Sequence, residues 1–163
     1  MSRRVSLFLL GLLCWIASAT AIAQTTPDIN GRINGIEYCF QSLGDVCDYK
    51  AKFTGTFIGK VDRFRDVAAI WDIELKHDDL NYEDGSQTRI LPDDGVWKLI
   101  LSNGVVISGF IDPGGTLTYH AGSNSFDVKM TLTATQGGGK VNVEAVLNHN
   151  VFPPTATGRM RSQ

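Results

Sequence analysis

The chain has 163 residues, with 15 basic and 17 acidic side chains and a formal net charge of −2 at pH 7. This length predicts one domain, large enough to bury a hydrophobic core. The basic residues are scattered and the net charge is negative, which argues against binding to nucleic acid or to anionic lipid.

Residues 1–23 have the three parts of a signal peptide. Arg3 and Arg4 supply positive charge, an apolar stretch covers residues 7–17, and small residues follow up to Ala23. An apolar stretch of this length is typical of an export signal and is too short to span a membrane. We therefore expect cleavage between Ala23 and Gln24, and a periplasmic or secreted product with no membrane span. A retained membrane anchor is the alternative that the short stretch disfavours.

Cleavage would leave 140 residues with 13 basic and 17 acidic side chains, a net charge of about −4. Residues 24–35 contain Pro27 and two Asn-Gly steps, and they predict a flexible N-terminal segment. Residues 36–163 then form a β-barrel-like domain.

Two cysteines, Cys39 and Cys47, remain in the exported part of the chain. An even number of cysteines in an exported protein favours a disulfide, here across a short loop that can turn at Gly44. Such a bridge would stabilise the fold by about 2–3 kcal/mol. A redox-active pair is the alternative, but the spacing is not Cys-x-x-Cys and no basic neighbour would favour the thiolate.

Apolar and polar residues alternate through most of the remaining chain. Residues 53–61, 67–75, 126–134 and 141–147 each place apolar side chains on one face. This period of two predicts half-buried antiparallel strands, and a short helix at residues 66–70 is the one competing assignment. Strand centres are expected near residues 38, 56, 71, 99, 107, 118, 130, 144 and 158.

Glycine-rich steps predict tight turns between these strands. Asn103-Gly104 predicts a two-residue hairpin that pairs Trp97 with Phe110. Residues 112–115 (Asp-Pro-Gly-Gly) predict a second reverse turn, which pairs Phe110 with Leu117. One face of this meander would then collect Trp97, Leu99, Leu101, Val106, Phe110, Leu117 and Tyr119.

The run Gly137-Gly138-Gly139 predicts a third hairpin with an even number of loop residues. An odd number would place Leu132 beside Glu144, whereas an even number places it beside Val143 or Ala145. Eight or nine strands joined in this way predict an all-β fold, a single antiparallel meander closed or nearly closed into a barrel. A two-sheet β-sandwich is the alternative.

The second face of the 97–120 meander is unusually apolar for a surface. It carries Ile100, Val105, Ile107 and Ile111. A free sheet face is normally more polar, so we expect either the same chain or a second copy, in a homo-oligomer, to cover it.

The polar motifs do not identify a metal or cofactor site. Asp79, Asn81 and Glu83 have the alternate spacing of a calcium loop, but Gly85 comes one position late and Ile90 stands where a bidentate Glu is needed. The three histidines, His77, His120 and His149, have no metal-ligand spacing. No nucleophile elbow, phosphate loop or dinucleotide fingerprint is present, so we expect no cofactor and assign no catalytic residue.

Aromatic residues are the best candidates for a binding site. We expect Trp71, Trp97, Phe110 and Tyr119 either to line an apolar cavity or to fill the core, with His149 at the barrel mouth. The favoured hypothesis is an exported, non-catalytic β-domain that binds a small apolar ligand or a protein partner. The alternative is a small barrel enzyme of cyclase, isomerase or lyase type acting on an apolar substrate. An open cavity containing His149 or a carboxylate would favour the enzyme.

Overall fold

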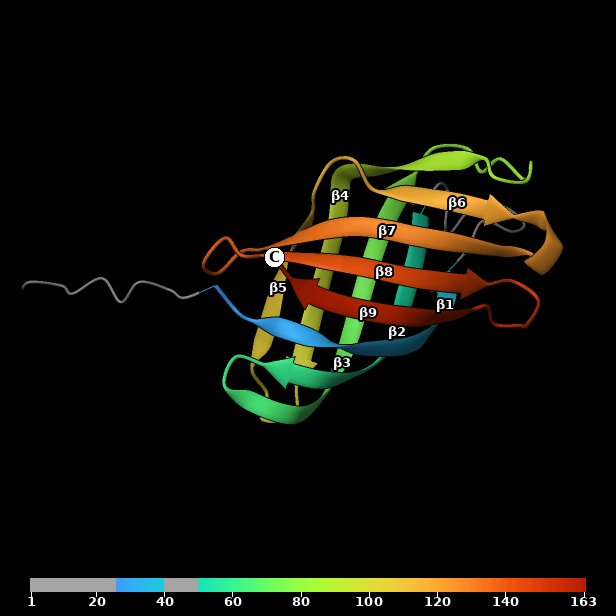
Figure 1. Ribbon diagram of the computed structural model, residues 1–163. Coiled ribbons are helices and arrows are strands. Elements are labelled where there is room, and N and C mark those ends of the chain that lie inside the picture. Colours follow the sequence, from blue (N-terminus) through green and yellow to red (C-terminus); the bar gives the residue numbers. More distant parts are fainter. Residues whose placement is uncertain (1–25, 40–49) are drawn as a thin grey trace, which may run out of the picture.

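The computed structural model describes residues 26–39 and 50–163, which form an all-β domain (Figure 1). Each of the nine predicted strand centres falls within one of its nine strands. The strands are β1 (Ile29–Cys39), β2 (Lys50–Val61), β3 (Phe64–His77), β4 (Gln87–Leu101), β5 (Val106–Ile111), β6 (Thr116–His120), β7 (Ser125–Ala134), β8 (Lys140–Asn148) and β9 (Thr155–Ser162). A 3-10 turn, η1 (Ala121–Ser123), joins β6 to β7.

Antiparallel pairing closes the sheet into a ring of eight strands, because β3 pairs with β4 and β1 pairs with β9. The ring is not evenly round. In Figure 1, β6, β7, β8, β9 and β1 cross the front of the molecule, while β3, β4 and β5 run behind them at a steep angle. A flattened barrel and a two-layer sandwich with crossing strands both describe this shape. The predicted all-β antiparallel fold is confirmed.

The first strand begins earlier than the predicted domain boundary at residue 36. Residues 29–35, which we placed in a flexible segment, pair with β2 on one side and with β9 on the other. The Asn-Gly steps are not turns here. Gly35 lies opposite Gly55, and a Cβ atom on Gly35 would lie 2.6 Å from the indole of Trp71. Glycine is used at this position for close packing inside a strongly bent sheet.

The interior of the ring is filled by the alternate side chains of each strand that point inward. Trp71, Trp97 and Phe57 are among its largest fully buried residues. Both indole N–H groups are satisfied, that of Trp71 by the carbonyl oxygen of Thr56 and that of Trp97 by the carbonyl oxygen of Thr133. Of the two expectations for Trp71 and Trp97, lining an apolar cavity or filling the core, the second therefore holds.

We expect Gly35→Ala to destabilise the fold by about 1–3 kcal/mol or more, because the new methyl group overlaps the neighbouring strand and an indole. Gly122→Ala in η1 is the matched control, since no heavy atom lies within 4 Å of the position of its Cβ. The free energy of unfolding in urea measures both variants. Equal stability of the two would contradict close packing at Gly35.

The hairpin between β4 and β5 differs from the prediction by one residue. The loop has three residues, with the amide of Leu101 donating to the carbonyl of Val105 and Gly104 at a φ of 83°. Trp97 consequently pairs with Gly109 and not with Phe110. Because side chains alternate, this slip turns the side chain of Phe110 outward.

The second predicted reverse turn is also wrong. β5 and β6 do not pair with each other, and both pair with β4 and with β7. They lie end to end at one position of the ring. Residues 112–115 form a bulge against β7, where Ile111 faces Leu132 and Thr116 faces Lys129. A glycine pair after a proline therefore bends the strand here without reversing it.

The third hairpin has a loop of four residues, one of the two lengths allowed by the even-number prediction. The amide of Ala134 donates to the carbonyl of Gly139 across it. Leu132 faces an apolar residue, but its partner is Val141 and not Val143 or Ala145.

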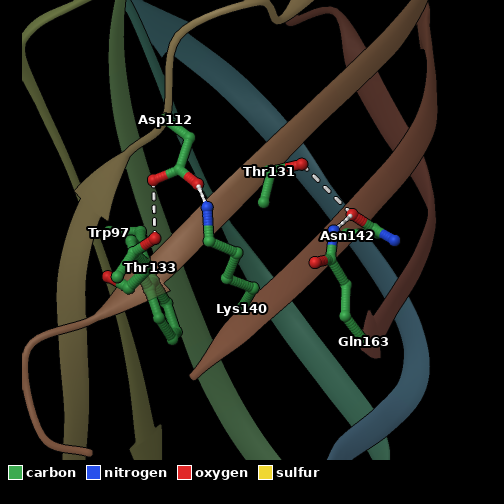
Figure 2. A network of polar contacts seen from close by, with 7 residues as sticks. All are labelled: Trp97, Asp112, Thr131, Thr133, Lys140, Asn142 and Gln163. Carbon is green, nitrogen blue, oxygen red and sulfur yellow. Dashed lines mark hydrogen bonds and ion pairs between the residues drawn. The ribbon is translucent and has the colours of Figure 1, made fainter. Parts of the chain in front are cut away.

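The buried carboxylate of Asp112 links the bulge at residues 112–115 to strands β7 and β8 by hydrogen bonds. Figure 2 shows Asp112 accepting hydrogen bonds from the Thr133 hydroxyl at 2.5 Å and the Lys140 ammonium at 2.6 Å. Burial alone would raise the pKa of Asp112, but these hydrogen bonds and the charge of Lys140 outweigh it and lower the pKa below its ordinary value. The ionised form of Asp112 is therefore stabilised by folding.

A carboxyl group with a lowered folded-state pKa contributes stability above its unfolded pKa of about 3.9, and this contribution is lost as pH falls through the folded value. We expect Asp112→Asn to cost about 1–3 kcal/mol at neutral pH. The difference from wild type should shrink as pH falls below about 4. Urea unfolding across this pH range tests the expectation, with Asp79→Asn, in an exposed loop, as the control. A difference independent of pH would show that the charge is irrelevant.

Candidate functional site

One end of the barrel contains a cavity of about 60 Å³. It lies where β1, β3 and β8 end and where β2 and β7 begin. Its lining combines polar and apolar side chains: Glu37, Ala51, Phe53, His77, Leu80, Tyr82, Leu117, Phe126, Leu147 and His149. Two larger hollows, of about 350 and 310 Å³, lie on the outer surface and are more open to solvent than the end cavity.

A buried acid and a histidine meet in this cavity. The Glu37 carboxylate oxygen Oε2 and the His149 ring nitrogen Nε2 are 3.2 Å apart, with side chains 4% and 18% exposed. The distance suits an ion pair when the imidazole is protonated. Both atoms are buried, yet within residues 26–39 and 50–163 neither has a hydrogen-bond partner of suitable geometry. Buried polar atoms are nearly always hydrogen-bonded, so two orphans side by side require an explanation.

Backbone contacts hold the two side chains in place. The amide of Glu37 donates to the carbonyl of Pro154 at 2.9 Å, which ties the end of β1 to the segment before β9. The amide of His149 donates to the carbonyl of Asn124 at 3.0 Å, and its ring packs edge-on against Phe126. The pair is therefore anchored from both sides of the cavity.

His77 continues the inward face of β3 and is buried in the cavity wall. Its Nδ1 lies 2.7 Å from the carbonyl oxygen of Asp78. Because a carbonyl can only accept, Nδ1 carries the proton, and in the neutral ring Nε2 is the acceptor. The cavity thus contains a second imidazole, that of His77, and the tautomer of this one is fixed by its contact with the backbone.

The acidic loop after β3 supplies the aromatic rim of the cavity. Tyr82 packs edge-on against Tyr119 and Phe126, with ring centroids 5.2 and 5.9 Å apart. Partial burial raises the pKa of the Tyr82 phenol, and the negative charge of Glu37 and the neighbouring Tyr119 raise it further. Backbone hydrogen bonds between Gly85, Ser86 and Tyr119 fix the loop against β6.

Of the five predicted ligand-binding residues, the structure brings only His149 to the cavity wall. Tyr119 packs behind the wall through its contacts with Tyr82 and Phe126. Trp71 and Trp97 lie in the core. Phe110 is 50% exposed on the outer surface, as the register shift requires.

The sequence patterns did not indicate four of the site residues, namely Glu37, His77, Tyr82 and Phe126. For two of these residues the alternation of inward and outward side chains along the strand is a usable signal. Glu37 follows Ile29 and Ile33 at even spacing, and His77 follows Trp71 and Ile73 in the same way. Both are polar residues at positions where the alternation predicts an inward apolar side chain.

The proposed partner surface also changes. Ile107 and Ile111 are buried in the core, so they cannot contribute to it. On the outer face, Ile70, Ile100 and Val106 lie opposite one another across β3, β4 and β5. Association through an apolar outer face stays a prediction, with these residues in place of Ile107 and Ile111.

Several expectations lie outside the described residues, namely the signal peptide, its cleavage site at Ala23 and Gln24, and Cys47 of the expected disulfide. Cys39 is described as the last residue of β1. Within residues 26–39 and 50–163, no three potential metal ligands come together, and no helix has the length and apolarity to cross a membrane. Comparisons with protein families, curated proteins and solved structures give no match.

Proposed function

We propose that this protein is an exported binding module that takes a small amphiphilic ligand into the end cavity. The supporting observation is that Glu37 and His149 meet in a partly enclosed cavity, where the described residues give neither contacting atom a hydrogen bond of suitable geometry. A ligand that supplies hydrogen-bond partners to both atoms removes the cost of leaving them unsatisfied. The binding function expected from the sequence is kept, but its location and chemistry change.

The polar pair disfavours the wholly apolar ligand that the aromatic residues had suggested. Burying a carboxylate against hydrocarbon without a partner costs several kcal/mol in general. Leu80, Leu117 and Leu147 give the cavity an apolar side, so a ligand with one polar end and one apolar end fits both parts of the wall.

The size of the cavity limits the enclosed part of the ligand. Sites that enclose a complete drug-sized molecule have about 300–1,000 Å³. A space of about 60 Å³ accommodates a head group or a very small molecule. We propose that any longer ligand extends past Tyr82, which is exposed at the rim.

A small barrel enzyme is the second candidate, and the same pair favours it. A carboxylate and an imidazole in one cavity are the groups that general acid–base catalysis uses, and His77 adds a third titratable group. In an isomerase or lyase, Glu37 or His149 would remove a proton from an enclosed substrate. Chemical conversion of the bound compound distinguishes an enzyme from a protein that only binds it.

We expect a panel of fragments with up to about ten non-hydrogen atoms to contain binders of about millimolar affinity. Glu37→Gln and His149→Gln should weaken binding at least about tenfold, because each removes one polar partner. Glu144→Gln on the exposed face of β8 is the matched control. Ligand-observed NMR measures affinity, and mass spectrometry of the same mixtures detects conversion. Conversion by wild type, lost in Glu37→Gln, would establish the enzyme; binders indifferent to all three substitutions would refute the site.

We also propose that the mature protein acts in the periplasm or outside the cell, starting at Gln24. When the complete sequence is expressed in a secreting host, the intact mass of the exported product should correspond to residues 24–163. Recovery of the uncleaved chain in the membrane fraction would instead indicate a retained anchor.

A further inference from the structure

We propose that the polar group recognised in the end cavity is a cationic nitrogen, such as the ammonium group of a primary amine. This inference rests on the proposed binding function and specifies the ligand class. It follows from three features of the site: its charge, its hydrogen-bonding capacity and its aromatic wall.

The charged groups of the lining are of one kind. Glu37 is buried there, and the lining residues that the structure describes include no Lys or Arg. An anionic ligand would add a second negative charge in a space of low dielectric constant, where like charges repel strongly. A cationic ligand compensates Glu37 without requiring protonation of His149. The loop that carries the lining residues Leu80 and Tyr82 also contains exposed Asp79 and Glu83, and such negative charges attract cations.

The hydrogen-bonding capacity of the pair matches an ammonium group. Glu37 Oε2 is an acceptor, and His149 Nε2 is a second acceptor when the ring is neutral and protonated at Nδ1. The two atoms are 3.2 Å apart, so one donor group placed beside the pair can reach both of them. An ammonium group carries three donors, whereas a hydroxyl carries one and would leave one of the two acceptors unsatisfied.

Aromatic rings complete the environment of a cation. Phe53, Tyr82 and Phe126 all line the cavity. The face of an aromatic ring attracts a cation, and the attraction is stronger where water is excluded. The combination of a buried carboxylate with several rings therefore selects a cationic nitrogen over a neutral polar group of the same size.

The test compares n-butylammonium with n-butanol and butanoate at constant ionic strength, using the full mature domain. We expect n-butylammonium to bind at least about tenfold more tightly than n-butanol, and butanoate to bind more weakly than either. Amide chemical shifts in wild type should change around Glu37 and His149. Glu37→Gln should abolish the preference for the amine, and Glu144→Gln should retain it.

The outcomes separate this inference from the proposed function. If n-butanol or butanoate binds at the cavity as tightly as the amine, the cationic class is wrong and the binding site stands. If n-butylammonium shifts only amides on the outer surface, or binds equally to Glu37→Gln, the inference also fails. If neither these three compounds nor the wider fragment panel binds at the cavity, both proposals fall. The shift map needs no substituted protein, so a Glu37 variant that folds poorly would not obscure the result.

Discussion

Closure of the antiparallel sheet is the constraint on which the rest of the structure depends. In a closed ring, every second side chain points into an enclosed space and cannot reach solvent through the wall. The centre of that space is filled by Trp71, Trp97 and Phe57. A polar side chain at an inward position can therefore meet water or a ligand only at the ends of the barrel. Glu37 and His77 occupy such end positions on β1 and β3, which is why they share a cavity.

Two neighbouring strands of the ring bend at the same place. Against β3, β4 changes register between the pairs Glu74–Val96 and Lys76–Leu91, so residues 92–95 bulge out of the ladder. The bulge at 112–115 lies beside it, since the amide of Ile90 donates to the carbonyl of Gly115. Bulges increase local twist, and two adjacent ones form a corner at which the sheet changes direction. The Asp112 contacts in Figure 2 fix this corner to β7 and β8.

Local alternation predicted the strands well, because a period of two depends only on neighbouring residues. The errors arose where glycine has several uses. Gly104 completes a three-residue loop and not a two-residue one, and that difference reverses the faces of β5, including Phe110. Gly35 allows close packing within a strand, although an Asn-Gly step usually indicates a turn. Pairing of β5 and β6 with β7 depends on distant contacts, such as that between Asp112 and Lys140, which no local pattern contains.

The candidate site shows the same division between local and distant information. The alternation of side chains along β1 and β3 could have placed Glu37 and His77 in the barrel interior. Their proximity to His149, however, depends on how the ring closes. The Glu37–His149 pair contributes little to the stability of the fold, because a buried ion pair often stabilises the folded state less than apolar residues of the same volume would. When the imidazole is neutral and Nε2 is an acceptor, the contact places two acceptors side by side, which is less favourable still. A ligand that satisfies both atoms would stabilise the folded state in proportion to its occupancy of the cavity. The Glu37–His149 pair, which lowers the stability of the free protein, is thus also the feature by which the cavity would select its ligand.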